Sequence, residues 1–198
     1  MNYLAHAYLS FNNEGILVGN MISDYVKGKK KFEYPIIIQK GITLHRAIDA
    51  FTDAHSATRE AEKLLKPFVG LYAGPLLDVI YDHFLAVDDT EFENDNALMN
   101  FTKKTYFLLK PYENLFPEKF AAMFPNMLLY NWLYHYQFNW GIERSFIGVV
   151  KRAKYLNDSS DAFKVFEKEY DSFKKYYQLF FPELKLFAKN KMTELLAE

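Results

Sequence analysis

The sequence contains no cysteine. Without thiols the chain has no disulfide bond, no cysteine nucleophile and no cysteine-ligated zinc, and this composition fits a reducing cytoplasm. An excess of one charge is also missing, because 24 lysines and arginines stand against 25 aspartates and glutamates and leave a net charge of −1. A balanced charge provides no general attraction to nucleic acid or to an anionic membrane, so we expect neither as a partner.

Long apolar runs are scarce as well. Residues 1–6 lack a basic start followed by a long apolar stretch, so they do not resemble a signal peptide. We find no stretch that approaches the roughly 20 apolar residues needed by a membrane-spanning helix. The sequence therefore predicts a soluble protein.

What the chain does contain is a helical pattern. Half of its 198 residues are hydrophobic, which is enough for one sizeable core. Apolar residues recur at three- and four-residue spacings, whereas strict alternation is rare, so we predict an all-α fold with a single compact domain over residues 1–198. Pro182 should break or kink the last helix. Helices are expected over residues 2–10, 14–27, 35–54, 56–66, 71–86, 94–109, 117–130, 140–155 and 159–181.

The first candidate group for chemistry is Asp78, Asp82 and His83. The two carboxylates lie four residues apart, on one helix face with apolar neighbours on both sides. Burying ionised groups is costly unless a cation or a hydrogen-bonding partner compensates them. The pair is therefore a candidate for metal ligation or catalysis, and ion pairing with a basic residue of another helix is the alternative.

A second group is formed by His45, Asp49 and Asp53, which follow one another at intervals of one helical turn. The stripe borders the apolar face of the same segment, so it need not point fully into water. A histidine and an aspartate one turn apart can share a metal ion, or the aspartate can orient the imidazole. A solvated helix face would produce the same spacing.

The third group lies near the N-terminus. Asn20, Asp24 and Lys27 share a helix face, where they either hold a metal and a phosphate or form an ordinary surface pair. His6, one turn after Asn2, is either a ligand or a hydrogen-bonded histidine near the core. Oxygen and nitrogen ligands without thiolates suit manganese or magnesium, and leave iron and zinc as further options.

Four blocks resemble, in the same order, the signature blocks of the acyl carrier protein phosphodiesterases: Met1–His6, Gly19–Gly28, Gly41–Asp53 and Asp78–Leu85. The resemblance implies a distorted relative of the His-Asp metal phosphohydrolase fold and a divalent metal, with Mn²⁺ first and Mg²⁺ or Fe²⁺ as alternatives. It also implies the substrate, the phosphodiester that joins 4′-phosphopantetheine to a serine of holo-acyl carrier protein. One departure is the turn at residues 147–149, where family members tend to carry Asn-Gly-Met and this chain has Ile-Gly-Val.

Within this resemblance each candidate residue has an expected role. The expected metal ligands are Asp24, His45 and Asp82, with His6 and Asp78 in reserve. His83 or Asp49 would move protons. Arg46 would clamp the phosphate. The residues expected to contact the phosphate or an acidic carrier protein are Asn20, Lys27, Lys29, Lys30, Lys31 and Lys40.

Two other functions remain compatible with the sequence. A His-Asp phosphohydrolase acting on a nucleotide or another small phosphoester would use the same ligands. A non-catalytic helical module that binds carrier protein would keep the fold and need no metal. The oligomeric state is open.

Overall fold

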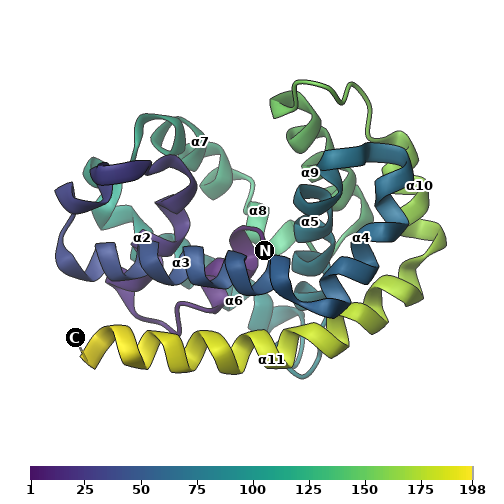
Figure 1. The fold of residues 1–198 in the computed structure, drawn as a ribbon. Coiled ribbons are helices and arrows are strands. Elements are labelled where there is room, and N and C mark those ends of the chain that lie inside the picture. The colour runs from purple at the N-terminus through teal and green to yellow at the C-terminus, as the bar shows by residue number, and fades with distance from the viewer. Residues whose placement is uncertain (198) are drawn as a thin grey trace.

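The computed structural model describes residues 1–197, which form α-helices joined by 3₁₀ helices and loops, with no β-strand among them (Figure 1). The all-α prediction is confirmed. The α-helices are α1 (Tyr3–Tyr8), α2 (Glu14–Ile22), α3 (Ile36–Ala54), α4 (Ser56–Val69), α5 (Ala73–Ala86), α6 (Asp95–Leu109), α7 (Glu118–Leu129), α8 (Trp132–His135), α9 (Asn139–Arg152), α10 (Ser160–Lys168) and α11 (Tyr170–Ala197). The 3₁₀ helices are η1 (Ser23–Tyr25), η2 (Gly28–Glu33), η3 (Gly70–Tyr72) and η4 (Lys110–Leu115).

Local side-chain chemistry explains where several helices begin. The side-chain oxygen of Asn13 accepts a hydrogen bond from the backbone N–H of Ile16 at the start of α2, at 3.1 Å. Asn94 accepts one from Ala97 at the start of α6, also at 3.1 Å. Each asparagine satisfies a backbone donor that the first turn of a helix leaves without an internal partner.

Glycines allow α2 and α3 to approach very closely where they cross. A Cβ added to Gly19 would lie 2.1 Å from the backbone oxygen of Ile38, and Gly41 is similarly confined from the other side. No side chain fits at such distances, so only glycine permits this contact. The close approach places Asn20 of α2 beside His45 of α3, and this pair belongs to the candidate site.

The C-terminal part of the chain differs from the prediction. Residues 159–181 form α10 and the first part of α11, and α11 passes through Pro182 without ending. Of the predicted break or kink at Pro182, the break is wrong. An interior proline costs about 3 kcal/mol, but α11 packs along α3 and α4 (Figure 1) and buries large side chains such as Phe180 and Leu184. Each of these stabilises the helix by roughly 1.5–3 kcal/mol.

The helices enclose one hydrophobic core, with fully buried side chains such as Leu4, Ile80 and Phe124 drawn from distant parts of the chain. One segment, Ser56–Ala86, is long and apolar enough to cross a membrane by length and composition, which the sequence analysis did not anticipate. In the structure this segment forms α4, η3 and α5, and α4 packs against α5. The segment changes direction near Gly70, whose φ is +55°, so it forms two core helices instead of one straight span.

Candidate metal centre

Histidine and aspartate side chains from α1 and α3 meet near the crossing of α2 and α3. His6 lies on α1, and His45 and Asp49 lie one turn apart on α3. One potential ligand atom from each of these residues lies within 4.8 Å of the others. The three residues are called the His-His-Asp cluster below.

The distances within the cluster are those of direct polar contact. His45 Nε2 lies 3.0 Å from Asp49 Oδ2, and His6 Nε2 lies 3.2 Å from Asp49 Oδ1. The two imidazole rings stack with their centroids 3.8 Å apart and an angle of 15° between their planes. Both histidines are buried, whereas Asp49 is partly exposed, so the cluster can be reached from solvent on the carboxylate side.

Asn20 orients both imidazoles through their Nδ1 atoms, while Nε2 of each ring lies toward Asp49. Its Nδ2 donates to the backbone oxygen of His6 at 2.8 Å and to Ser10 Oγ at 3.1 Å, so its Oδ1 must accept from His6 Nδ1, at 2.8 Å. Its backbone oxygen accepts from His45 Nδ1 at 2.7 Å. Both histidines therefore carry a proton on Nδ1 and direct Nε2 toward Asp49, which is the arrangement that metal-binding histidines adopt.

The Nε2 atom of His6 has no hydrogen-bond partner although it is buried. Its distance of 3.2 Å to Asp49 is short enough for an ion pair, but the geometry is not that of a hydrogen bond. A buried nitrogen lone pair without a partner costs free energy, and a cation beside it would remove that cost. The donor set of two imidazole nitrogens and a carboxylate, without thiols, fits a divalent metal ion.

The charges of the cluster also suit a divalent metal ion. Burial lowers the pKa of His45, but hydrogen bonds with Asp24 and Asp49 outweigh burial and raise it to about 9. Burial and the charge on His45 lower the pKa of His6. Burial would raise the pKa of Asp49, but the close contacts with His45 and His6 lower it instead. The cluster thus holds a positive charge between two carboxylates, and a divalent cation would supply that charge and release the proton.

Asp24 lies at the edge of the cluster. Its Oδ1 is 3.1 Å from His45 Nε2, while its side chain is 65% exposed. The hydrogen bond with His45 is the main reason that the pKa of Asp24 is lowered. Asp24 is therefore the ionised, solvent-facing member of the group.

Asp82 is not part of the cluster. Its carboxylate is fully buried and accepts hydrogen bonds from the backbone N–H groups of Asn2, Leu4 and Ala5, at 3.2, 2.7 and 3.2 Å. Burial raises its pKa to about 7, although the ammonium group of Met1 and these backbone donors work in the opposite direction. Asp82 thus caps α1, the helix that carries the first histidine of the cluster.

Asp78 is linked to the His-His-Asp cluster by the α-amino group of Met1, which lies between Asp78 and Asp49. That nitrogen donates to Asp78 Oδ1 at 2.8 Å and lies 3.8 Å from Asp49 Oδ1. Burial lowers the pKa of this amino group, but Asp78 and Asp49 raise it to a net value of about 10. The ammonium group therefore stays charged between the two carboxylates.

His83 lies elsewhere in the core, and both of its ring nitrogens are occupied. Nδ1 donates to the backbone oxygen of Tyr136 at 2.8 Å, and Nε2 lies 2.9 Å from the hydroxyl of Tyr170. Burial lowers the pKa of His83. The structure does not bring His83 to the His-His-Asp cluster.

The predicted phosphate and docking residues are mostly on the surface. Arg46 is exposed and donates to the backbone oxygen of Val26 at 2.9 Å. Lys31 donates to Thr43 Oγ1 at 3.3 Å. Asn20 is the exception, because it is fully buried behind the imidazoles. The exposed basic residues of this region are Lys27, Lys29 and Lys30, and Lys31 and Lys40 are partly buried.

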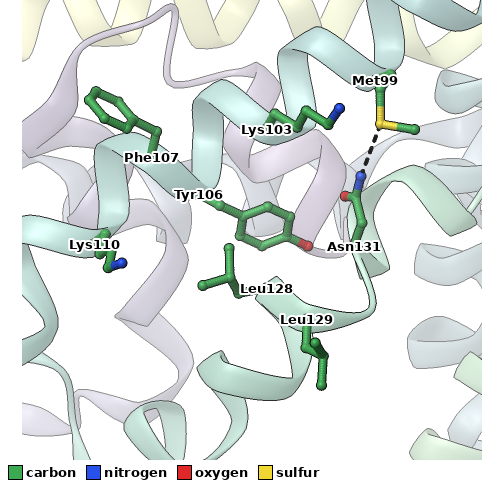
Figure 2. Close-up of a pocket in the computed structure, with 8 residues that line it drawn as sticks. All are labelled: Met99, Lys103, Tyr106, Phe107, Lys110, Leu128, Leu129 and Asn131. Atoms are coloured by element: carbon green, nitrogen blue, oxygen red, sulfur yellow. Dashed lines mark hydrogen bonds between the residues drawn. The ribbon is translucent and has the colours of Figure 1, made fainter.

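Two cavities were not anticipated from the sequence. One, of about 520 Å³, lies between α6 and α7 and contains Lys103 and Lys110 but no histidine or carboxylate (Figure 2). The other, of about 340 Å³, lies beside α1 and is bordered by Arg144 and Arg152 of α9. Neither arginine was predicted as a site residue from the sequence, because only the fold brings α9 next to α1.

A family model and several known proteins with similar sequences all carry the same family name. The family model described as acyl carrier protein phosphodiesterase matches residues 1–184. A protein of that name from Klebsiella pneumoniae (strain 342) is 30% identical over 191 residues, which cover 96% of this chain and 99% of the relative. One from Photorhabdus laumondii is 29% identical and covers 96% of both chains. No solved structure matches. The chain belongs to the acyl carrier protein phosphodiesterase family.

Proposed function

We propose that this chain is a metal-dependent phosphodiesterase that removes 4′-phosphopantetheine from the serine of holo-acyl carrier protein. Family membership supports the reaction and the substrate. The observation that carries the metal dependence is the convergence of His6, His45 and Asp49, with Nδ1 of each imidazole held by Asn20. The absence of cysteine fits the cytoplasm, where we place the enzyme.

The proposed ligands are His6, His45 and Asp49, with Asp24 beside them. Asp49 thus takes the place that the sequence analysis gave to Asp82, whose carboxylate is engaged by α1. Nitrogen and oxygen donors suit Mn²⁺, Mg²⁺ or Fe²⁺, and Mn²⁺ is the first candidate. When bound, such an ion lowers the pKa of coordinated water and neutralises phosphoryl oxygens.

Hydrolysis adds a water oxygen to phosphorus and breaks the bond between phosphorus and the serine oxygen, which takes up a proton. A group beside the cluster has to accept the proton that the water loses. Asp24 suits this task, because its carboxylate is ionised, largely exposed and 3.1 Å from His45 Nε2. The proposal therefore assigns proton transfer to Asp24, and not to His83, whose nitrogens both have partners.

A test of the reaction compares substrates in the presence of Mn²⁺. We expect the protein to convert holo-acyl carrier protein to the apo form, detected as loss of the phosphopantetheine mass, and to lose this activity when a chelator is added. Hydrolysis of nucleotides or small phosphoesters without action on the carrier protein would instead support a general phosphohydrolase. Binding of carrier protein without hydrolysis would support a non-catalytic module.

The lysines that follow Asp24 in the chain, exposed Lys29 and Lys30 and partly buried Lys31, offer a docking surface for an acidic carrier protein. Reversing the charge at Lys29, Lys30 and Lys31 is expected to raise KM for holo-acyl carrier protein and to weaken its dependence on salt, with little change in kcat. The matched control reverses three exposed lysines of α11, Lys174, Lys175 and Lys189, and therefore changes the net charge equally. If both triple variants behave alike, the docking assignment is wrong.

A further inference from the structure

The cavity of about 340 Å³ lies beside the start of α1, between that helix, α8 and α9. Asn2, which caps α1, and Tyr3, its first residue, form part of the cavity wall. Its volume is within the range of small-molecule sites, which begins at about 300 Å³. The cavity between α6 and α7 in Figure 2 shares no lining residue with it and includes none from α1.

Tyr3 connects this cavity with the His-His-Asp cluster. It lies one turn before His6 on α1, and its hydroxyl is 2.8 Å from that of Tyr25, the residue that follows Asp24. Burial and the contact with Tyr25 raise the pKa of Tyr3 well above its usual value, and the charges of Arg152 and Asp24 also act on it. Tyr3 thus lines the cavity, shares α1 with His6 of the cluster and contacts the residue next to Asp24.

The cavity has aromatic side chains in its wall and open space beside Gly148. Trp132, Tyr136 and Trp140 contribute aromatic side chains. The facing surface of α9 includes small residues, and a Cβ added to Gly148 would meet no atom within 4 Å. Gly148 lies inside α9, within the helix predicted over residues 140–155, so this residue is held on a helix face. Its missing side chain therefore leaves part of the cavity open.

Three cations border the same space: Arg144, Lys151 and Arg152. Lys151 and Arg152 follow Arg144 by seven and eight residues on α9, which is about two helical turns, so all three lie on one side of the helix. Within residues 1–197 no carboxylate lies in ion-pair distance of any of them, and the cavity lining contains no aspartate or glutamate. Cations without counterions beside an aromatic cavity suit a ligand that is largely uncharged and ends in a phosphate.

We propose that this cavity receives the pantetheine arm of the carrier protein's prosthetic group. The methyl and methylene groups of the arm would lie against the aromatic walls. The phosphodiester at its end would then lie between the cations of α9 and the His-His-Asp cluster. This inference rests on the proposed function, because only that reaction brings such an arm to the cluster.

The proposal can be tested by a substitution on α9 that fills the cavity. Gly148→Phe projects a ring into the free space, and the backbone has no need to move because nothing lies within 4 Å of the new Cβ. We expect kcat/KM for holo-acyl carrier protein to fall about 100-fold, because the phosphodiester can no longer reach its position. The control is Ile147→Phe, at a neighbouring position that is 44% exposed and outside the lining, with an effect within about twofold. Unfolding temperature and bound manganese show whether each variant is folded.

Direct binding tests the cavity independently of turnover. We would titrate the manganese-loaded protein with pantetheine, 4′-phosphopantetheine and inorganic phosphate by calorimetry. The wild type is expected to bind both pantetheine compounds, and Gly148→Phe to bind them at least about tenfold more weakly while it retains phosphate binding. In Arg144→Gln/Arg152→Gln, the advantage of phosphopantetheine over pantetheine should shrink.

The two proposals fail in different ways. If the wild type hydrolyses holo-acyl carrier protein and Gly148→Phe does so equally well, the cavity assignment is overturned and the proposed function stands. The same holds if pantetheine does not bind and phosphate binds as tightly as phosphopantetheine. If the wild type does not hydrolyse the carrier protein but binds pantetheine and Gly148→Phe does not, the proposed function is overturned and the cavity assignment stands.

Discussion

Replacing Asn20 with alanine should loosen the metal centre without removing a ligand. The substitution deletes the acceptor of His6 Nδ1 and the two donor contacts, to the backbone oxygen of His6 and to Ser10 Oγ. The contact with His45 is made by the backbone oxygen of Asn20 and survives. His6 thus loses the partner that fixes its ring orientation and tautomer, while His45 keeps its own.

The structure sets the size of two separate effects. Asn20 is fully buried, so its removal leaves His6 Nδ1 without a partner, at a cost of about 1–3 kcal/mol in the free energy of unfolding, whereas Ser10 Oγ still donates to the backbone oxygen of His6. Removing a group that orients a metal-bound histidine lowers metal affinity about 10–100-fold. That loss corresponds to about 1.4–2.8 kcal/mol in the free energy of binding.

Calorimetric titration with Mn²⁺ and urea denaturation of the metal-free protein measure the two effects. Phe124→Leu is the control, because Phe124 is buried on α7 away from the cluster and its replacement should cost up to about 1.5 kcal/mol of stability with no change in manganese affinity. Asn20→Ala should lose both stability and affinity. Wild-type manganese affinity in Asn20→Ala would refute the argument that Asn20 orients His6 for the metal.

Two further predictions concern the buried groups outside the cluster. Asp82→Asn should lower the free energy of unfolding by about 1–3 kcal/mol, because an amide N–H then faces backbone donors. Bound manganese, measured by elemental analysis, should stay at the wild-type level. Loss of the metal would restore Asp82 as a ligand. His83 has a pKa lowered by burial, so the unfolded chain binds its proton more readily and stability is lost as pH falls below the ordinary value of about 6.5. The free energy of unfolding, measured by urea denaturation between pH 7 and 5, should therefore fall more steeply for the wild type than for His83→Gln, by up to about 1.4 kcal/mol per pH unit. Equal slopes would contradict a neutral buried His83.

The sequence contains enough information to predict several partners of the site but not their arrangement. His45 and Asp49 one turn apart on one helix predicted neighbours, and the structure places them in contact. Asp82 had the same spacing from Asp78, and its apolar surroundings correctly indicated burial that needs compensation. The compensating groups are backbone N–H donors of α1, and side-chain patterns along one helix contain no information about such long-range backbone partners.

Tertiary contacts also explain the remaining differences. Pro182 favours a helix end by its local chemistry, but packing of α11 on α3 and α4 outweighs that preference. The cavity beside α1 is formed by residues more than a hundred positions apart, such as Tyr3 and Arg144. Periodicity predicts which face of a helix is buried, but not which distant helix will lie opposite to it.

The metal content of the purified protein and its variants tests the central claim most directly. After dialysis against Mn²⁺ and removal of free metal, elemental analysis should find a single manganese ion per chain in the wild type and in His83→Gln, and none in His45→Ala or Asp49→Ala. Manganese bound equally to all four proteins, or hydrolysis of holo-acyl carrier protein that persists in Asp49→Ala and in a chelator, would contradict the account.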